Sequence, residues 1–173
     1  NVDVIQGRNS YSYMTPLLNS MSDKSLLKPY LQGYTAFKTG HADAAIKLKE
    51  ALTKDPYHLQ GLIKLAELYI RNGEDQKAFD VSKTAISIDA HHGAANYYYG
   101  LSATHLHKEA DAIDGFSIAT MSVEYKSAAL TELAKIHAQH KRWDKALSYA
   151  SQATDYNKYN SDAIAIQIIA NQQ

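Results

Sequence analysis

The chain has 173 residues, and its 18 lysines and arginines balance its 18 aspartates and glutamates, so it lacks the basic excess that a nucleic-acid-binding surface needs. The absence of cysteine excludes disulfides, thiolate catalysis and cysteine-ligated zinc, and no apolar run is long enough to span a membrane. Three prolines, eight glycines and frequent apolar spacings of three and four residues predict an all-helical protein.

The beginning of the sequence bears on its origin and location. The chain starts at Asn1 rather than Met and shows no signal peptide, which we interpret as a fragment cut from a longer protein. The absence of cysteine fits either the cytoplasm or an exported bacterial protein, so the location stays open, with the cytoplasm favoured.

Residues 1–24 are predicted to form an amino-terminal arm. Residues 1–10 show no apolar period, whereas residues 11–21 are more apolar. Within that stretch, Thr15 and Pro16 have the pattern of a helix cap followed by a first-turn proline. We therefore expect a short packing helix in the second half of the arm.

Four helix pairs and a last helix follow the arm. Asp55-Pro56 ends the first pair, because proline cannot continue a helix. Asn72-Gly73 is a helix stop at which glycine can adopt the left-handed conformation, and Asp162 suits the positive end of the last helix. The predicted pairs are 26–39 with 42–54, 59–72 with 75–89, 93–106 with 109–121, and 127–140 with 143–156, and the last helix is 161–171.

Small residues recur along these helices at one fixed interval. The three ladders are Ala44, Ala78, Ala112 and Ala146; Ala51, Ala85, Ala119 and Ala153; and Ala66, Gly100 and Ala134. Their common period is that of one helix–turn–helix unit, about 34 residues. We expect the ladder residues to be buried where helices approach closely, and Gly100 to be the point where the first helix of its unit meets the second.

On these residues the sequence resembles the tetratricopeptide (TPR) repeat family. The segment Leu62 to Asp89, LIKLAELYIRNGEDQKAFDVSKTAISID, matches the family pattern nearly throughout. The other units match with losses: His107 and Lys141 stand where glycine is usual, and the turn of the first unit is one residue short. The resemblance implies an all-α fold, a right-handed α-solenoid of antiparallel helix pairs. The implied units are TPR 1 (25–56), TPR 2 (57–90), TPR 3 (91–124), TPR 4 (125–158) and a terminal half repeat (159–173).

A narrower resemblance concerns the segments ANYYYGL, DGFSIA and SVEYKSAALTELAKIHA. They are similar to the TPR segment of large bacterial proteins of unknown function, in which a β-rich, mutarotase-like domain precedes the repeats. This resemblance implies a larger parent protein whose catalytic or sugar-related domain is not in this chain.

The TPR resemblance also implies a concave groove lined by the first helices of the units. Carried over position by position, the groove residues are Tyr30, Tyr34 and Phe37 from the first unit; Ile63, Glu67, Ile70 and Arg71 from the second; Tyr97, Leu101, Thr104 and His105 from the third; and Thr131, Lys135, Ala138 and Gln139 from the fourth. The amino-terminal half would be apolar and aromatic, and exposed patches of that kind usually bind something. Because residues two apart on a helix differ in direction by about 200°, we expect Tyr97 to face the groove and Tyr99 the core.

Two functions remain open at this point. The favoured one is a protein–protein interaction module that binds a peptide or partner domain, of unknown identity, in the groove. The alternative is a structural spacer, a docking arm or a homodimerisation surface, with the groove filled by arm residues of the same chain or of a second copy: Tyr11, Tyr13, Met14, Leu17 and Met21. Simple packing of Tyr97 is an equally open interpretation of that residue.

Patterns that carry chemistry are absent from the sequence. There is no glycine-rich phosphate loop and no Gly-x-Ser-x-Gly elbow. Asp111 and Asp114 are expected to complement a helix dipole and face solvent rather than act as an acid–base pair. His137 and His140 have a spacing that can ligate a metal, but we expect packed or solvated histidines, because no glutamate completes the zinc-protease pattern. We therefore predict no enzyme, cofactor, metal, nucleic-acid partner or membrane partner.

Overall fold

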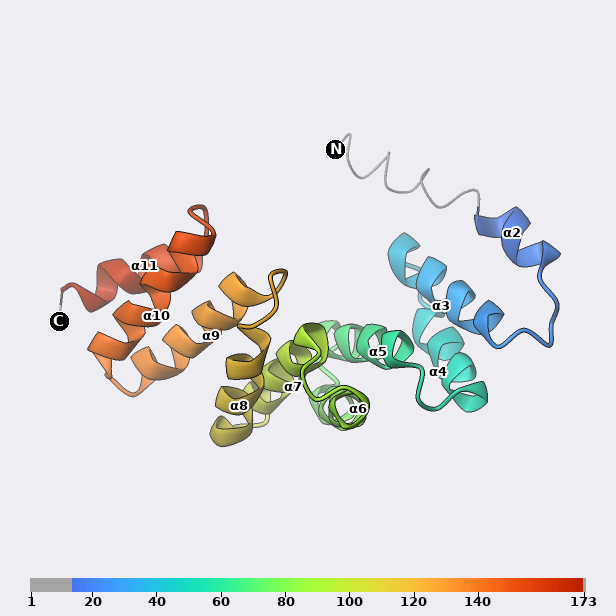
Figure 1. Cartoon of the computed structure of the whole chain (residues 1–173), viewed down its shortest axis with the longest axis horizontal. Helices are drawn as coiled ribbons and strands as arrows, with labels where there is room; N and C mark the ends of the chain where they lie inside the picture. Colours follow the sequence, from blue (N-terminus) through green and yellow to red (C-terminus); the bar gives the residue numbers. More distant parts are fainter. Residues whose placement is uncertain (1–13, 173) are drawn as a thin grey trace. The chain divides into compact units, whose positions relative to one another are not determined.

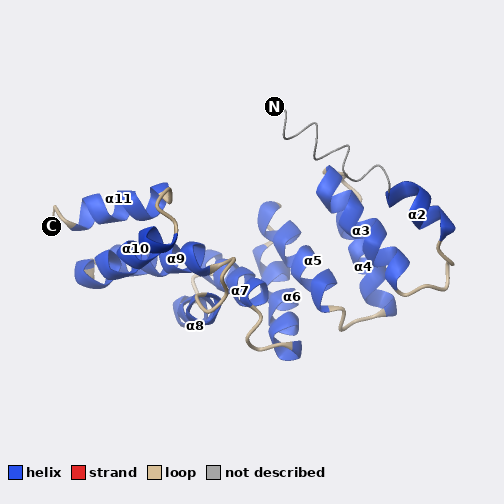
Figure 2. Cartoon of the chain, turned by 45° about the horizontal axis from the view of Figure 1, so that its top comes forward, coloured by secondary structure: helices blue, strands red, loops and turns tan. Residues whose placement is uncertain are grey.

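The computed structural model describes residues 14–172, and these residues form helices joined by loops, with no strand among them (Figures 1 and 2). The helices are α2 (Met14–Ser20), α3 (Leu27–Thr39), α4 (Ala44–Lys54), α5 (Leu59–Arg71), α6 (Asp75–Ile88), α7 (Gly93–His105), α8 (Glu109–Ala119), α9 (Lys126–Gln139), α10 (Trp143–Tyr156) and α11 (Ser161–Ala170). From α3 onward, their bounds agree with the predicted ones to within two residues. In the described part of the chain, every helix falls short of the length and apolarity that crossing a membrane requires.

The chain divides into two compact units after Ile88, and unit 1 holds α2 and two helix pairs. The pairs are α3 with α4 and α5 with α6. Their core contains Leu48 from α4, Leu65 and Tyr69 from α5, and Ala78 from α6. The two pairs of unit 1 therefore stack on one another through a shared apolar core.

Helix α2 packs on α3, with the side chains of Met14 and Leu18 buried. The described part of this helix runs from Met14, so Thr15 lies inside the helix, and the predicted cap at that position is wrong.

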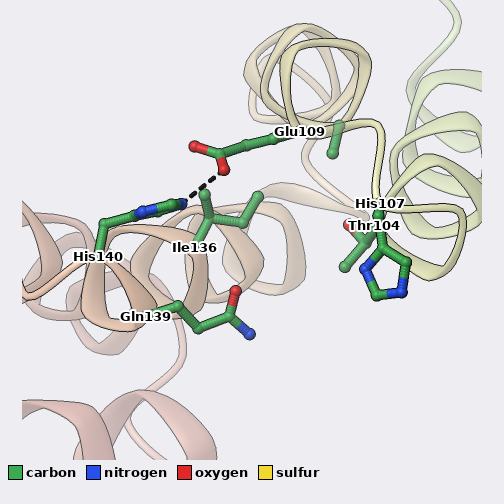
Figure 3. A pocket seen from close by; sticks show the side chains of 7 residues that line it. Thr104, His107, Glu109, Ile136, Gln139 and His140 are labelled. Atoms are coloured by element: carbon green, nitrogen blue, oxygen red, sulfur yellow. Dashed lines mark hydrogen bonds and ion pairs between the residues drawn. The ribbon is translucent and has the colours of Figure 1, made fainter.

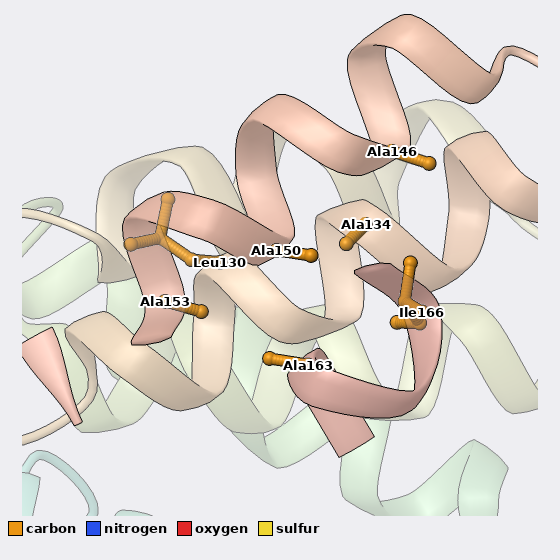
Figure 4. Close-up of a cluster of buried hydrophobic side chains, with 7 residues drawn as sticks. All are labelled: Leu130, Ala134, Ala146, Ala150, Ala153, Ala163 and Ile166. Carbon is orange, nitrogen blue, oxygen red and sulfur yellow. The ribbon is translucent and has the colours of Figure 1, made fainter. Parts of the chain in front are cut away.

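Unit 2 holds the pairs α7 with α8 and α9 with α10, followed by α11. One of its core clusters joins α9, α10 and α11 (Figure 4). The members are Leu130, Ala134, Ala146, Ala150, Ala153, Ala163 and Ile166. Because alanines predominate, the backbones of these three helices approach closely.

The alanine and glycine ladders lie in the interior, as predicted. Every ladder alanine is at most 2% exposed, and Gly100 is buried. A Cβ built at Gly100 would lie 2.8 Å from ring carbons of Phe116 on α8, and one built at Gly33 would lie 2.9 Å from Leu48 on α4. The expected contact of Gly100 with the second helix of its unit is therefore confirmed.

The turns inside the four helix pairs share one backbone conformation. Their left-handed residues are Gly40, Gly73, His107 and Lys141, with φ values of 73°, 72°, 57° and 56°. In each turn the next residue donates its N–H to a carbonyl five residues earlier, as Lys108 does to Ala103 at 2.8 Å. The missing glycines in the third and fourth units therefore left the turn unchanged and introduced backbone strain instead.

Candidate functional site

Helices α3 and α5 of unit 1 bring together an aromatic ring and three charged side chains. The Lys64 ammonium and the Arg71 guanidinium lie 5.3 and 4.8 Å from the centre of the Phe37 ring. Both cations donate hydrogen bonds to the Glu67 carboxylate, at 2.9 and 2.7 Å. These spacings of three and four residues place the charges on one face of α5. That face therefore carries two cations against one carboxylate.

Tyr30 and Tyr34 lie on the same helix as Phe37. Their ring centroids are 6.0 Å apart, and the ring of Tyr30 lies 4.2 Å from that of His58. His58 caps α5, because its Nδ1 accepts the N–H of Gly61 at 3.0 Å. Burial raises the pKa of the Tyr30 phenol above its ordinary value. Tyr30 therefore packs against the beginning of the next first helix, while remaining partly exposed.

In unit 2 three partly exposed tyrosines form a cluster. Tyr97 and Tyr98 of α7 have ring centroids 5.7 Å apart, and Tyr125, the N-cap residue of α9, lies 5.1 Å from Tyr97 and 6.2 Å from Tyr98. Tyr97 also lies 5.9 Å from the ring of Phe116. Burial, and then the charge of Glu132, raise the pKa of Tyr97 to about 12. Its phenol is therefore a neutral hydrogen-bond donor at physiological pH.

Next along α9, one lysine holds two carboxylates. The Lys135 ammonium donates to Glu132 at 2.9 Å and lies 2.8 Å from a carboxylate oxygen of Asp162 on α11. Burial lowers the pKa of Lys135, but its hydrogen bonds to Asp162 and Glu132 outweigh burial and raise it. The Lys135 hydrogen bond and charge in turn lower the pKa of Asp162. This face therefore carries two carboxylates against one cation.

Asn160 ties α11 to α9 beside these charges. Its Oδ1 accepts the N–H of Ala163 at 3.1 Å and caps α11, while its Nδ2 donates to the hydroxyls of Ser127 and Thr131 at 2.9 and 2.8 Å. These bonds give the 3% exposed hydroxyl side chain of Thr131 its partners inside the protein. Thr131 thus helps to fix the packing of two first helices.

A pocket of about 260 Å³ lies in unit 2 at the ends of α7 and α9 (Figure 3). It brings two predicted groove residues, Thr104 and Gln139, to one place. The Glu109 carboxylate at the beginning of α8 points to the ring of His140, 2.5 Å from Nε2, and also accepts from Arg142 at 3.1 Å. The hydrogen bond from His140 lowers the pKa of Glu109 more than that from Arg142. This ion-paired rim fastens α8 to the turn that follows α9.

Comparisons by sequence return nothing: no family model matches the chain, and no curated protein matches it. Solved structures do match. The structure of MamA protein is 21% identical with a TM-score of 0.76, over 85% of this chain and 81% of that one. YrrB, a TPR protein with an unusual peptide-binding site, is 15% identical with a TM-score of 0.75, over 93% and 82%. TTC0263, a thermophilic TPR protein of Thermus thermophilus, is 20% identical with a TM-score of 0.66, over 87% and 83%.

The chain has the TPR fold. It is all-α and built from helix pairs, as the resemblance in the sequence implied. The first helices of the TPR pairs are α3, α5, α7 and α9, and α11 stands in the place of a further first helix.

Three of the predicted groove residues lie in the interior of the TPR fold. Phe37, Ile63 and Thr131 are only 7%, 2% and 3% exposed, so their side chains are not available to a ligand. Phe37 packs with Ala36, Ala44 and Leu68, and Thr131 is held by Asn160. Phe37 and Thr131 each contact a residue of the next repeat, so these two groove positions of the family pattern are packing positions in this chain.

The remaining predicted residues keep exposed surface. Arg71, His105 and Gln139 are exposed, and the partly exposed residues are Tyr30, Tyr34, Glu67, Ile70, Tyr97, Leu101, Thr104, Lys135 and Ala138. Tyr99, in contrast, is 8% exposed, which agrees with the angular argument that separated it from Tyr97. A binding role for any of these residues stays a prediction.

The described helix of the arm, α2, meets α3 away from the face that carries Tyr30 and Tyr34. The α3 residues that meet α2 around one hollow are Gln32, Thr35, Ala36 and Thr39. At 100° per residue, these positions lie on the opposite side of α3 from Tyr30 and Tyr34. Leu17 of α2 is 47% exposed, and Tyr11 and Tyr13 lie outside the described residues. Within the described residues α2 therefore packs on another side of α3, and filling of the groove by arm residues such as Met21, from this chain or from a second copy, stays a prediction.

Several residues of these clusters were not predicted from the sequence. Tyr125, Glu132 and Asp162 contribute to the unit 2 cluster, and Lys64 and His58 to that of unit 1. The charge pairs at i and i+3 on α5 and α9 could have been predicted from the sequence, because oppositely charged residues at that spacing share a helix face. The contacts made by Tyr125 and Asp162 come from other elements and carry no sequence signal.

The acidic and histidine candidates have structural partners. Asp111 accepts a hydrogen bond from the Tyr99 hydroxyl at 2.7 Å and is partly buried, so the expectation that it faces solvent is wrong. His137 is 6% exposed and stacks on Tyr149 with ring centroids 5.3 Å apart, whereas His140 pairs with Glu109. Over residues 14–172 no three histidine or carboxylate side chains converge in a way that could hold a metal ion.

Proposed function

We propose that the chain is a protein-interaction module that binds a peptide or partner domain on its first helices. The observation that carries the proposal is the cluster of Tyr97, Tyr98 and Tyr125, whose rings are close together yet partly exposed. Tyrosine offers a large apolar contact and a hydroxyl while losing little rotamer freedom, which makes it a frequent anchor residue at interfaces.

The paired charges beside the aromatic residues support the same function. Glu67 in unit 1 and Lys135 in unit 2 are each held by two opposite charges, so both side chains have fixed positions. Fixed charges at the edge of an apolar contact give an interface orientation and selectivity. The peptide-binding site named for YrrB supports a binding role for this kind of fold and identifies no ligand for this chain.

The proposal can be tested by selecting peptides from a random display library on the purified chain. Affinities of the selected peptides are then measured by calorimetry for the native chain, Tyr97→Ala and a matched control, Tyr159→Ala. Tyr159 belongs to the same unit and is 92% exposed in the loop before α11. We expect Tyr97→Ala to lose about tenfold or more in affinity and Tyr159→Ala to keep it. Equal binding by all three proteins would contradict the proposal.

A docking or dimerisation surface is the second candidate function, and α11 favours it. Ile164, Ile168 and Ile169 on this helix are 37%, 56% and 48% exposed. Ile168 also continues the ladder of Ala66, Gly100 and Ala134, at a position where each of these earlier units has alanine or glycine. An isoleucine there prevents the close helix approach made at Gly33 and Gly100. Light scattering over a concentration series tests dimerisation through this helix: dimers that Ile168→Glu dissociates would support it, and a monomer throughout would reject it.

A further inference from the structure

Equivalent positions of the two units carry charge pairs of opposite order. Lys64 and Glu67 on α5 correspond, two repeats later, to Glu132 and Lys135 on α9. Each pair is closed at about 2.9 Å. In unit 1 the third charge is a cation, Arg71, whereas in unit 2 it is a carboxylate, that of Asp162. The unit 2 face is therefore short of one positive charge, and the unit 1 face is not.

The excess negative charge of unit 2 lies beside aromatic rings that suit a cation. Glu132 follows Tyr125 by seven residues, about two helical turns, so both lie on the same side of α9, next to the tyrosine cluster. The side chain of Glu132 is only 18% exposed, which leaves its carboxylate poorly solvated and strengthens its pairing with any cation that reaches it. The faces of Tyr97, Tyr98 and Tyr125 can add cation–π attraction to a guanidinium or ammonium group.

We propose that unit 2 recognises a basic side chain of the partner, held between the tyrosine cluster and the carboxylates of Glu132 and Asp162. This inference rests on the proposed binding function and names the chemistry that one face would read. Arginine fits better than lysine, because its planar guanidinium stacks on aromatic rings and donates two parallel hydrogen bonds to a carboxylate. The ammonium of Lys135 already pairs with both carboxylates, so it competes with the incoming cation for them.

Because Lys135 competes with the bound cation, removing a carboxylate and removing Lys135 should change the affinity in opposite directions. The probe is N-acetyl-L-arginine amide, titrated into the chain while the tyrosine ring signals are followed by NMR, with the neutral N-acetyl-L-glutamine amide as reference. We expect saturable shifts at Tyr97, Tyr98 and Tyr125 with the arginine probe only. Glu132→Gln and Asp162→Asn should weaken binding about fivefold, and Lys135→Met should strengthen it by a similar factor. Glu124→Gln, which removes an exposed carboxylate of the same unit, is the matched control and should leave binding unchanged.

The outcomes separate this inference from the function on which it rests. Equal shifts with the glutamine probe, or a Lys135→Met variant that binds the arginine probe no better, would overturn the inference. Selected peptides that depend on Tyr97 but contain no arginine or lysine would also overturn it, and would leave the interaction function standing. Unfolding midpoints of the variants show that any loss of binding comes from the charge and not from misfolding.

Discussion

The ring of Phe116 occupies the space that a side chain at Gly100 would need. A Cβ at Gly100 would lie 2.8 Å from two ring carbons, and Phe116 itself is completely buried. We expect Gly100→Ala to lower the free energy of unfolding by about 1–3 kcal/mol, because a buried ring cannot move away without displacing its own neighbours. In the double variant Gly100→Ala/Phe116→Leu, leucine is smaller than phenylalanine and leaves room for the added methyl group, so part of the lost stability should return. Urea denaturation measures both, and an unchanged midpoint for Gly100→Ala would contradict the close helix approach.

The left-handed turns at His107 and Lys141 predict stabilisation by glycine. Both residues are exposed and have φ near 57°. A non-glycine residue in this region costs roughly 1–2 kcal/mol, of which the greater freedom of unfolded glycine returns a part. His107→Gly and Lys141→Gly should therefore each raise the free energy of unfolding by about 0.5–1 kcal/mol, as measured by urea denaturation.

The reciprocal substitution serves as the control for these turns. A Cβ at Gly73 would meet no atom within 4 Å, so Gly73→Ala creates no steric clash, and its effect comes from backbone strain less the reduced freedom of the unfolded chain. It should destabilise the chain by about 1 kcal/mol. Loss of stability in His107→Gly would show that the imidazole makes a contact of greater value than the strain.

The buried imidazole of His137 predicts a dependence of stability on pH. Burial, followed by the charges of Arg142 and Lys145, lowers the pKa of His137 below its ordinary value of 6.5, and its Nδ1 finds no hydrogen-bond partner among the residues that the structure describes. The unfolded chain therefore binds a proton more readily than the folded chain. The stabilisation is complete above pH 6.5 and is lost as the pH falls through the lower folded pKa, with a slope of at most about 1.4 kcal/mol per pH unit. Thermal unfolding between pH 5 and 8 should show this slope in the native chain and a flatter profile in His137→Gln.

Tyr97 and Tyr99 should respond differently to truncation. Tyr99 is 8% exposed and donates a hydrogen bond to Asp111, so Tyr99→Ala should cost about 3–5 kcal/mol of stability and Tyr99→Phe about 1 kcal/mol. Tyr97 retains exposed surface, and Tyr97→Ala should cost less, about 1–2 kcal/mol for its contacts with Phe116 and Tyr125. Denaturant unfolding ranks the variants, and equal losses for the two alanine variants would contradict the assignment of Tyr99 alone to the core.

Periodicity made most of the fold readable from the sequence. The small-residue ladders set the repeat, and the repeat set the helix bounds and the burial of residues such as Ala112 and Tyr99. The conformation of the turns was harder to predict. Nothing in the local sequence of His107 and Lys141 indicates a left-handed backbone, and only their position in the repeat, where glycine is usual, points to it.

The candidate site was less readable, because its contacts join residues distant in sequence. Phe37 and Thr131 occupy positions that face a groove in the family pattern, yet here they pack against Leu68 and Asn160. Similarly, the partner of Lys135 on α11 could not be found from the spacing within α9. A repeat pattern specifies which way a side chain points, whereas the identity of the neighbour it meets depends on the next repeat.

The alanine cluster between α9, α10 and α11 limits which positions of this sequence can change during evolution. Its alanines have no side-chain rotamers to immobilise, so their burial stabilises unit 2 without the entropy loss of larger residues. At Ala134, Ala146, Ala150, Ala153 and Ala163, nearly every single-base change enlarges the side chain, and a larger side chain at a fully buried position overpacks the core. Substitutions should therefore accumulate in the turns and on the first-helix faces, where a new side chain leaves the fold unchanged.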